Sequence, residues 1–348
     1  MIKAPVPELV IPASGRAAES GLPQFVEHGG EIANRHPADA IDSRLYGFVL
    51  PADRSLLDAY CDRLFNDPSG GDQHWQSAAG EVLLNFVDIP VMASTEVLDR
   101  RLGFTKEKEA AIWFPIVDKE RKKFGWAIPY MFVDSALALA GGREVYGFPK
   151  QMGNLEMPED RAREPAALTI KTVTLEVHEP DCKAKKHWVV TVERPGTAAR
   201  IGIGSKSPRP LLRKVKQPRD GAGDHGAFGR ATTSARPRND ALADVLFFKH
   251  LVDENVPMLL LKQFRDAQVQ GAACYQAVVL VNMVVSKFRG GGLMPGDYRV
   301  HINDLAGEPI MRELGIAATC SPRLAFWLNF DFVVRLGEIL WEARVERR

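Results

Sequence analysis

One lysine in this sequence has a setting suited to carbonyl chemistry. Lys150 follows Pro149 at the end of the run 140–150, AGGREVYGFPK, which is apolar in part and punctuated by glycine. A neutral lysine amine attacks carbonyl carbons, but an ammonium with the usual pKa of ~10.4 does not. Burial can lower that pKa by several units and so restore the nucleophile. The pattern alone favours the ordinary alternative, a solvated lysine in a surface turn.

Three charged residues are candidate partners of this lysine, and each also has an ordinary interpretation. Arg44 begins a predicted strand, Glu107 lies in the sequence Lys-Glu-Lys-Glu that is typical of a solvated turn, and Arg143 could be an exposed helix charge. The sequence contains no GxSxG elbow, no Walker loop and no HExxH motif. The usual hydrolase, NTPase and metalloprotease chemistries are therefore not indicated.

No sequence pattern indicates a cofactor or a metal. The segment 221–226, GAGDHG, matches GxGxxG, but no predicted strand precedes it and no apolar helix follows it. It therefore lacks the context of a dinucleotide site. The eight histidines are scattered, and we expect them to be surface or structural residues. The four cysteines form no CxxC pair and are expected to be reduced thiols, not disulfides or zinc ligands.

Two segments are predicted to lie outside the core. We expect an N-terminal extension over residues 1–40 and one domain over 41–348, interrupted at about 194–240 by a basic, Pro- and Gly-rich insertion. Between positions 194 and 238 the insertion holds eleven Lys or Arg against two Asp, with one aromatic residue. A mobile charged loop is therefore favoured over a nucleic-acid surface.

The overall balance of charge and hydropathy is typical of a cytoplasmic, soluble protein. Basic and acidic residues number 45 and 44, which gives no general case for nucleic acid or an anionic membrane as a partner. No run approaches the ~20 apolar residues that span a bilayer. Prolines and a glutamate interrupt the apolar residues near the start, unlike the core of a signal peptide.

Predicted strands outnumber predicted helices. Branched and aromatic residues predict strands over 44–50, 82–92, 111–117, 127–133, 168–178, 187–192, 257–264, 274–288, 298–302 and part of 324–340. Helices are predicted over 54–65 and 134–146, and Gly147 with Pro149 ends the second one just before Lys150. Strands that rarely alternate with helices indicate an α+β fold with mainly antiparallel sheets.

The run 142–150 resembles the signature of the acetoacetate decarboxylase family, in which a glycine-arginine-glutamate sequence leads to a proline-lysine pair. The resemblance extends beyond this motif. Residues 42–46, DSRLY, are similar to the family's early arginine-bearing strand, and residues 103–115, with GFTKE and AIWFP, are similar to the segment that carries its active-site glutamate. Residues 257–262 and 275–288 resemble its later paired strands.

This resemblance implies a fold, a reaction and a set of site residues. The implied fold is α+β, with curved, mainly antiparallel sheets that form a cone-like barrel pocket with a few flanking helices. Lys150 would be the Schiff-base lysine, and Glu107 would position the substrate or move protons. Arg44 would bind the substrate carboxylate through its planar guanidinium, and Gln151 and Arg143 would be further substrate-binding residues. A homo-oligomer without cofactor or metal is implied.

Two positions depart from the family's pattern. In the family a second lysine follows the reactive one, and its charge helps to lower the first pKa; here that position is Gln151. Acetoacetate decarboxylase is the standard example of a lysine activated by desolvation or a second cation. The family's further active-site glutamate also has no clear counterpart between Asn85 and Asp88. Burial would therefore be the main cause of a lowered pKa at Lys150.

Three functions remain open on these grounds. The leading one is a Schiff-base lyase that acts on a small keto acid, as a β-keto acid decarboxylase. The first alternative is an aldolase or dehydratase on 2-keto acids that uses the same lysine imine. The second is a non-catalytic binder of small carbonyl acids. Borohydride would trap a keto acid on either enzyme but not on a plain binder.

Overall fold

The computed structural model describes residues 36–101, 103–160, 164–195 and 255–343, with the short pieces 22–23 and 25–26. Most of the predicted extension 1–40 and almost all of the insertion 194–240 lie outside the described residues. Residues 34–348 form one compact unit, and residues 1–33 form another. The description below applies to the first of these units. Among the described residues, no helix combines the length and the apolarity that crossing a membrane requires.

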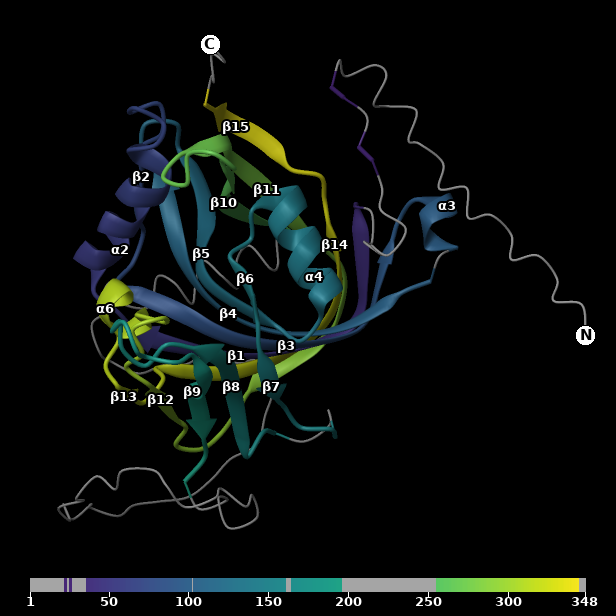
Figure 1. Cartoon of the computed structure of the whole chain (residues 1–348). Coiled ribbons are helices and arrows are strands. Elements are labelled where there is room, and N and C mark those ends of the chain that lie inside the picture. The colour runs from purple at the N-terminus through teal and green to yellow at the C-terminus, as the bar shows by residue number, and fades with distance from the viewer. Residues whose placement is uncertain are drawn as a thin grey trace, which may run out of the picture. The chain divides into compact units, whose positions relative to one another are not determined.

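A curved ten-stranded sheet is the main element of the fold (Figure 1). In spatial order its strands are β2 (Trp75–Ser77), β4 (Thr105–Asp118), β3 (Glu81–Ser94), β1 (Ala38–Pro51), β14 (Leu324–Val334), β11 (Ala273–Leu293), β10 (Asn255–Arg265), β5 (Lys123–Val133) and β6 (Lys150–Met152), and β15 (Glu338–Glu342) pairs with β11. An additional pairing of β4 with β5 closes the order into a ring. Most pairings are antiparallel, but β5 pairs in parallel with both β10 and β6.

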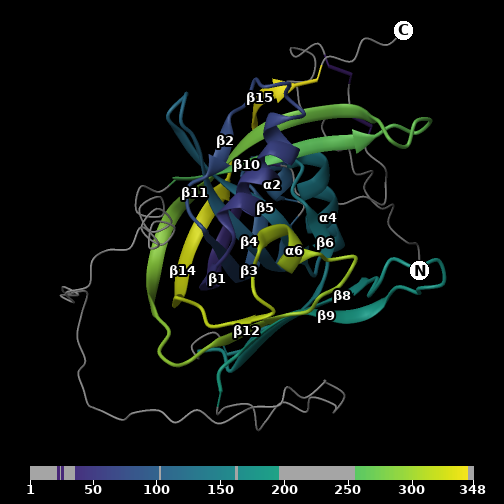
Figure 2. The ribbon, with the colours of Figure 1, turned by 90° about the vertical axis from the view of Figure 1, so that its left-hand side faces the viewer.

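A second sheet of five strands completes the β structure. Its order is β13 (Thr319–Cys320), β12 (Arg299–Ile302), β9 (Lys185–Glu193), β8 (Ala167–Thr174) and β7 (Asn154–Glu156). Figures 1 and 2 both show β8 and β9 below the large sheet. The predicted hairpin of 168–178 with 187–192 is confirmed as the antiparallel pair β8–β9.

The helices are short, and both predicted ones are confirmed. Helix α2 (Arg54–Cys61) continues as a π-helical turn (Asp62–Asn66), and α4 (Ala136–Gly141) continues as another (Gly142–Tyr146). The side chains of Asp53 and Ser135 cap the first turns of α2 and α4. In the described part of the chain, the remaining helices are α3 (Val97–Arg100) and α6 (Ile310–Leu314). The α+β class and the curved, mostly antiparallel sheet are thus confirmed, whereas the cone-like barrel stays a prediction.

The large sheet has a hydrophobic core on each face, because successive side chains of a strand point to opposite sides. On β1, Leu45 and Val49 belong to one core, whereas Tyr46 and Phe48 belong to the other. The first core also contains Tyr146 from the turn after α4, and the second contains residues of α2, α6 and the smaller sheet. Alternate residues of one strand therefore join different cores.

Candidate active site

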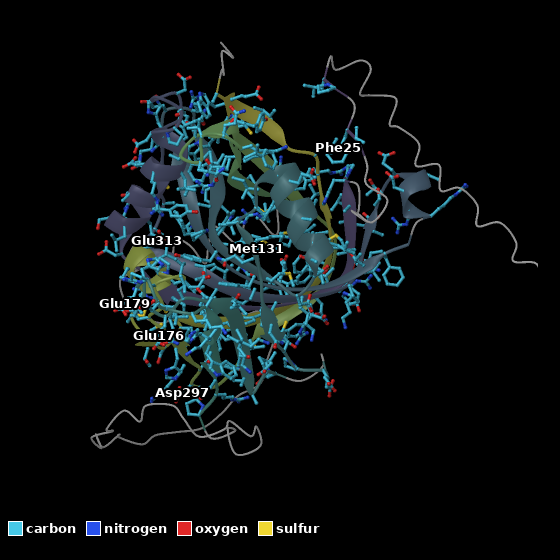
Figure 3. All side chains as sticks on the ribbon, viewed as in Figure 1. Phe25, Met131, Glu176, Glu179, Asp297 and Glu313 are labelled. Atoms are coloured by element: carbon cyan, nitrogen blue, oxygen red, sulfur yellow. The ribbon has the colours of Figure 1, made fainter. Side chains whose placement is uncertain are left out.

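A cavity of about 80 Å³ lies in the core that contains Tyr146. Its polar lining residues are His36, Thr105, Glu107, Glu109, Trp113, Tyr146 and Lys150. Its apolar wall includes Met92, Met131, Met258, Met283 and Phe332. Figure 3 labels Met131 on β5, in the region that the large sheet curves around. The cavity therefore combines a few convergent polar groups with a largely apolar wall, as ligand sites usually do.

The amine of Lys150 is buried in this cavity and paired with a carboxylate. Nζ lies 2.8 Å from Oε1 of Glu107, and the two side chains are 10% and 3% exposed. Lys150 is the first residue of β6 and pairs with Met131 of β5, while Glu107 on β4 pairs with Ile89 of β3. Sheet hydrogen bonds thus fix both backbones. The structure thus brings Lys150 and Glu107 together.

Two glycines shape the turn that delivers this lysine. Gly147 ends the π-helical turn in the left-handed region, with φ of 83°, which glycine adopts without strain. A side chain at Gly142 would place its Cβ 2.6 Å from Cδ and 3.3 Å from Nζ of Lys150. The helix backbone and the lysine side chain therefore approach so closely that a Cβ at position 142 would displace the side chain of Lys150.

Glu109 is a second carboxyl group in the cavity, and the sequence analysis did not single it out. It stands two residues after Glu107 on β4, so both side chains point to the same face of the sheet. Burial, with the negative charge of Glu107 as the next cause, raises the pKa of Glu109 to about 8, and Lys150 opposes the shift. The two carboxyl groups share a hydrogen bond. The sequence analysis interpreted the Lys-Glu-Lys-Glu segment as a solvated turn, whereas in the structure it belongs to β4.

Two further polar groups line the cavity with atoms that lack partners among the described residues. These are Nδ1 of His36 and the indole Nε1 of Trp113, and both atoms are buried. Burial lowers the pKa of His36 to about 4, and the positive charge of Lys150 adds to the effect. The imidazole is therefore neutral at pH 7. Its ring packs edge-on against Tyr146, with ring centroids 4.8 Å apart.

Arg143 lies beside the backbone of Lys150 and is not among the residues that line the cavity of the Lys150 amine. Its Nη1 donates a hydrogen bond to the carbonyl oxygen of Lys150 over 3.1 Å. It lines a second cavity of about 240 Å³, together with Phe148 and apolar residues such as Leu261 and Phe264. Its predicted part in substrate binding stays a prediction, whereas its contact with the Lys150 backbone is observed.

Gln151 is turned away from the cavity. It follows Lys150 on the same strand and so points to the opposite face. Its Nε2 donates to a carboxylate oxygen of Glu308 over 3.0 Å. Burial raises the pKa of Glu308, and the hydrogen bond from Gln151 opposes that shift. An ammonium at position 151 would therefore meet Glu308, not the amine of Lys150.

Arg44 is buried, but it is not among the cavity-lining residues. Its guanidinium stacks on the ring of Trp327 at 3.8 Å, and Nη1 donates to Oδ1 of Asn329 over 3.1 Å. The neighbour Leu45 joins the core that contains the cavity, so Arg44 points to the opposite face of β1. The structure thus brings Glu107, but not Arg44, into the cavity of Lys150. The carboxylate-binding role of Arg44 stays a prediction.

The described residues contain no group of three or more His, Cys, Asp or Glu that could hold a metal ion. The chemistry that this arrangement offers is that of an amine beside two carboxyl groups. The amine can add to a carbonyl carbon once it has lost a proton, and the carboxyl groups can accept and return protons at hydrogen-bond distance.

Comparisons with known proteins agree with the resemblance. The family model of acetoacetate decarboxylase matches residues 77–200, which include Glu107, Glu109 and Lys150. A search of curated proteins finds no match. The crystal structure of acetoacetate decarboxylase from Legionella pneumophila subsp. pneumophila str. Philadelphia 1 is similar, with a TM-score of 0.57 and 17% identity over 93% of this chain and 94% of that one. A further acetoacetate decarboxylase structure has a TM-score of 0.50 and 13% identity, over 90% and 93% of the two chains. The matched segment thus resembles acetoacetate decarboxylase, and the chain has the fold of these two structures.

Proposed function

We propose that the protein is a lyase that forms a Schiff base through Lys150 and acts on a small keto acid, as a decarboxylase of the acetoacetate decarboxylase type. The observation that carries the proposal is the buried amine of Lys150, held 2.8 Å from Glu107 in a small cavity with an apolar wall. The fold and the matched segment support the same class of enzyme.

The proposed reaction uses the iminium as an electron sink. The amine of Lys150 adds to the ketone carbon, and loss of water gives an iminium. The bond to the carboxylate then breaks, CO2 leaves, and the electron pair of that bond forms an enamine. A proton adds to the enamine carbon, and water releases the ketone and the amine.

The apolar wall of the cavity is compatible with the loss of CO2 from the iminium. Lys150 is the single Lys or Arg among the described lining residues, so a substrate carboxylate would face mainly apolar side chains. A buried carboxylate without a partner is destabilised, and it loses its charge when it leaves as CO2. The apolar wall would therefore favour decarboxylation of the iminium over its hydrolysis.

An aldolase or dehydratase that uses the same imine is the second candidate. The observation in its favour is the pair of carboxyl groups, Glu107 and Glu109, beside the amine. Aldol condensation and dehydration require protons to be removed from and returned to the substrate, which paired carboxyl groups can do.

Borohydride reduction in the presence of a keto acid tests these proposals. The protein would be incubated with acetoacetate or pyruvate and reduced. Mass spectrometry of the intact protein would then detect the adduct, and peptide mapping would locate it. We expect one adduct per chain, on Lys150, and CO2 release from acetoacetate separates the decarboxylase from the aldolase or dehydratase. Adduct formation with neither acid, or on another lysine, would contradict the imine; binding without an adduct would indicate a non-catalytic binder of carbonyl acids.

The cytoplasmic location and the homo-oligomeric state also remain proposals. Their support is the sequence composition for the first and the family resemblance for the second. Light scattering on the purified full-length chain measures the oligomeric state directly, and a mass equal to one chain of 38.5 kDa would contradict the second proposal.

A further inference from the structure

Two carboxyl groups, not one, stand beside the reactive amine. Glu107 contacts Nζ of Lys150, and Glu109 is hydrogen-bonded to Glu107 from two residues further along β4. Residue Glu109 itself is 8% exposed and lines the same cavity. It is thus placed within one hydrogen bond of the ion pair and within reach of a molecule bound in the cavity.

The charges around Glu109 favour its protonated form. On the neighbouring strands its direct partners are Val87 and Val133, which carry no charge. A second buried carboxylate beside the Glu107–Lys150 pair would have no cation of its own, which is costly in a buried site. The same balance explains why the pKa of Glu109 is raised to about 8.

Few other titratable groups face Glu109. Among the described lining residues these are Glu107, Lys150, His36 and Tyr146. His36 is neutral at pH 7, and burial raises the pKa of Tyr146, whose hydroxyl donates to the carbonyl oxygen of Arg335. The parts of the wall from β3, β5, α4, β10, β11 and β14 are uncharged side chains. Glu109 is therefore the one described lining group that can supply an acidic proton while Glu107 is paired with the amine.

We propose that Glu109 is a second catalytic carboxyl group, which protonates the departing hydroxyl of the carbinolamine. The proposal rests on the proposed imine chemistry of Lys150. It goes beyond that chemistry because it assigns the general acid of carbinolamine dehydration to Glu109 and not to Glu107, the ion-pair partner of Lys150.

The protons balance as follows. Before reaction Lys150 is an ammonium, Glu107 a carboxylate and Glu109 a carboxylic acid. The ammonium gives one proton to Glu107, and the neutral amine adds to the carbonyl carbon; one nitrogen proton then moves through Glu107 to the carbonyl oxygen. The product is a neutral carbinolamine beside two protonated carboxyl groups.

Dehydration then consumes one of these two protons. The carbon–oxygen bond breaks, the hydroxyl leaves as water with the proton of Glu109, and the nitrogen lone pair forms the iminium. The carboxyl pair holds one proton again, and its single negative charge balances the iminium. With Glu107 alone, the same carboxyl would have to take up the amine's proton and deliver it to the hydroxyl from one position.

Substitution of Glu109 by Gln tests the proposal, because the amide keeps a neutral hydrogen-bonding group of similar size but is not an acid. Adduct formation with pyruvate and with acetoacetate would be followed in cyanoborohydride for the full-length native protein and the variant. We expect the variant to be about 10² to 10⁴ times slower, which is the range of general acid catalysis. The ratio of native to variant rates should fall as pH rises through about 8, where Glu109 loses its proton. Glu109→Asp, which keeps the acid, should recover part of the rate.

The outcomes separate this proposal from the imine itself. Equal rates for native protein and Glu109→Gln, with the adduct on Lys150, would overturn the role of Glu109 and leave the imine intact. An absence of any Lys150 adduct on the native protein would overturn both. If the variant does not fold, infrared spectroscopy of the native protein decides. A protonated carboxylic acid band should be present at neutral pH and disappear through about pH 8, and its absence at neutral pH would overturn the proposal.

Discussion

At the scale of single residues, the ion pair between Lys150 and Glu107 sets the first requirement of the proposed reaction. An ammonium cannot attack a carbonyl, so the proton must leave before the carbon–nitrogen bond forms. Glu107 lies 2.8 Å from Nζ and is the natural acceptor.

Lys150→Arg should abolish the borohydride adduct and keep the fold, because a guanidinium stays protonated and forms no imine. The matched control is Lys262→Arg. Lys262 is the described lysine for which burial lowers the pKa, so it is the strongest rival nucleophile. We expect mass mapping to find the adduct on Lys150 in the Lys262→Arg variant, at the native level. An adduct that survives Lys150→Arg would contradict the assignment.

Arg44→Ala should destabilise the protein instead of altering its choice of substrate. The guanidinium stacks on Trp327 and donates to Asn329 in a buried site, so its loss should cost about 2 to 3 kcal/mol in the free energy of unfolding. Arg100→Ala, which removes an exposed ion pair with Asp39, should cost less than about 1 kcal/mol. Urea unfolding measures both values.

The competing expectation for Arg44 is a direct contact with the substrate carboxylate. In that case Arg44→Ala would weaken adduct formation with acetoacetate far more than with a neutral ketone such as acetone. From the placement of Arg44 on the other face of β1, we expect the two probes to change by the same factor.

At the scale of elements, the turn between α4 and β6 positions the amine. Helix α4 continues as a π-helical turn, Gly147 ends it, and three residues later Lys150 starts β6. The backbone of Lys150 is held from both sides, by Arg143 and by β5. The amine therefore depends on how closely this turn packs against its own side chain.

Gly142→Ala should displace the amine of Lys150 and slow adduct formation at least tenfold. Its backbone has helical φ and ψ, so alanine fits the conformation and even favours the helix by up to about 1 kcal/mol. The new methyl group, however, would collide with the lysine side chain. Gly271→Ala is the control, because a Cβ there meets nothing within 4 Å and Gly271 is not among the cavity-lining residues. The rate of adduct formation in cyanoborohydride distinguishes them, and equal rates would contradict the prediction.

The sequence predicts where helices and strands lie better than it predicts on which face of the sheet a side chain lies. The helix over 134–146 and the Pro149–Lys150 boundary follow from caps, glycine and proline, which act locally. The face that a strand residue occupies depends on where each strand begins and on its bulges, such as the one between Ala40 and Ser43 on β1. A motif alone could therefore not show that Arg44 points away from Lys150.

The missed carboxyl group has a related cause. The segment Lys-Glu-Lys-Glu was interpreted as a solvated turn because all four residues are charged. In the structure it is the start of β4, with Glu107 and Glu109 buried and Lys106 exposed. Burying two acids is unfavourable unless a cation and a shared proton compensate for it, and the cation, Lys150, lies 43 residues from Glu107 in the sequence. Local patterns carry no such information.

At the scale of the whole molecule, Glu109 and His36 should make stability depend on pH in opposite directions. The pKa of Glu109 is raised from 4.5 to about 8, so its contribution to stability is complete below pH 4.5 and is lost as pH rises through about 8. The pKa of His36 is lowered from 6.5 to about 4, so its contribution is present above pH 6.5 and is lost as pH falls through about 4. Above pH 6.5, of these two groups, Glu109 alone titrates.

Between pH 6.5 and 8, the native protein should therefore lose stability relative to Glu109→Gln as pH rises. In this window the unfolded native chain releases the proton of Glu109, whereas the folded protein retains it until about pH 8. The glutamine of the variant carries no such proton. Urea unfolding of both proteins at a series of pH values measures the difference. Parallel stability curves over this window would show that Glu109 is ionised in the folded protein at pH 6.5.

Different stretches of the chain supply the polar groups and part of the apolar wall of the cavity. Glu107, Glu109 and Lys150 all lie within 107–150, whereas Met258, Met283 and Phe332 of the apolar wall come from β10, β11 and β14. The groups of the proposed reaction are thus encoded in one continuous stretch, and part of the apolar wall is encoded in another. Mutations in the later strands can change which molecule enters while the reacting groups stay in place. A gene with this layout can acquire new substrates without having to evolve its chemistry again.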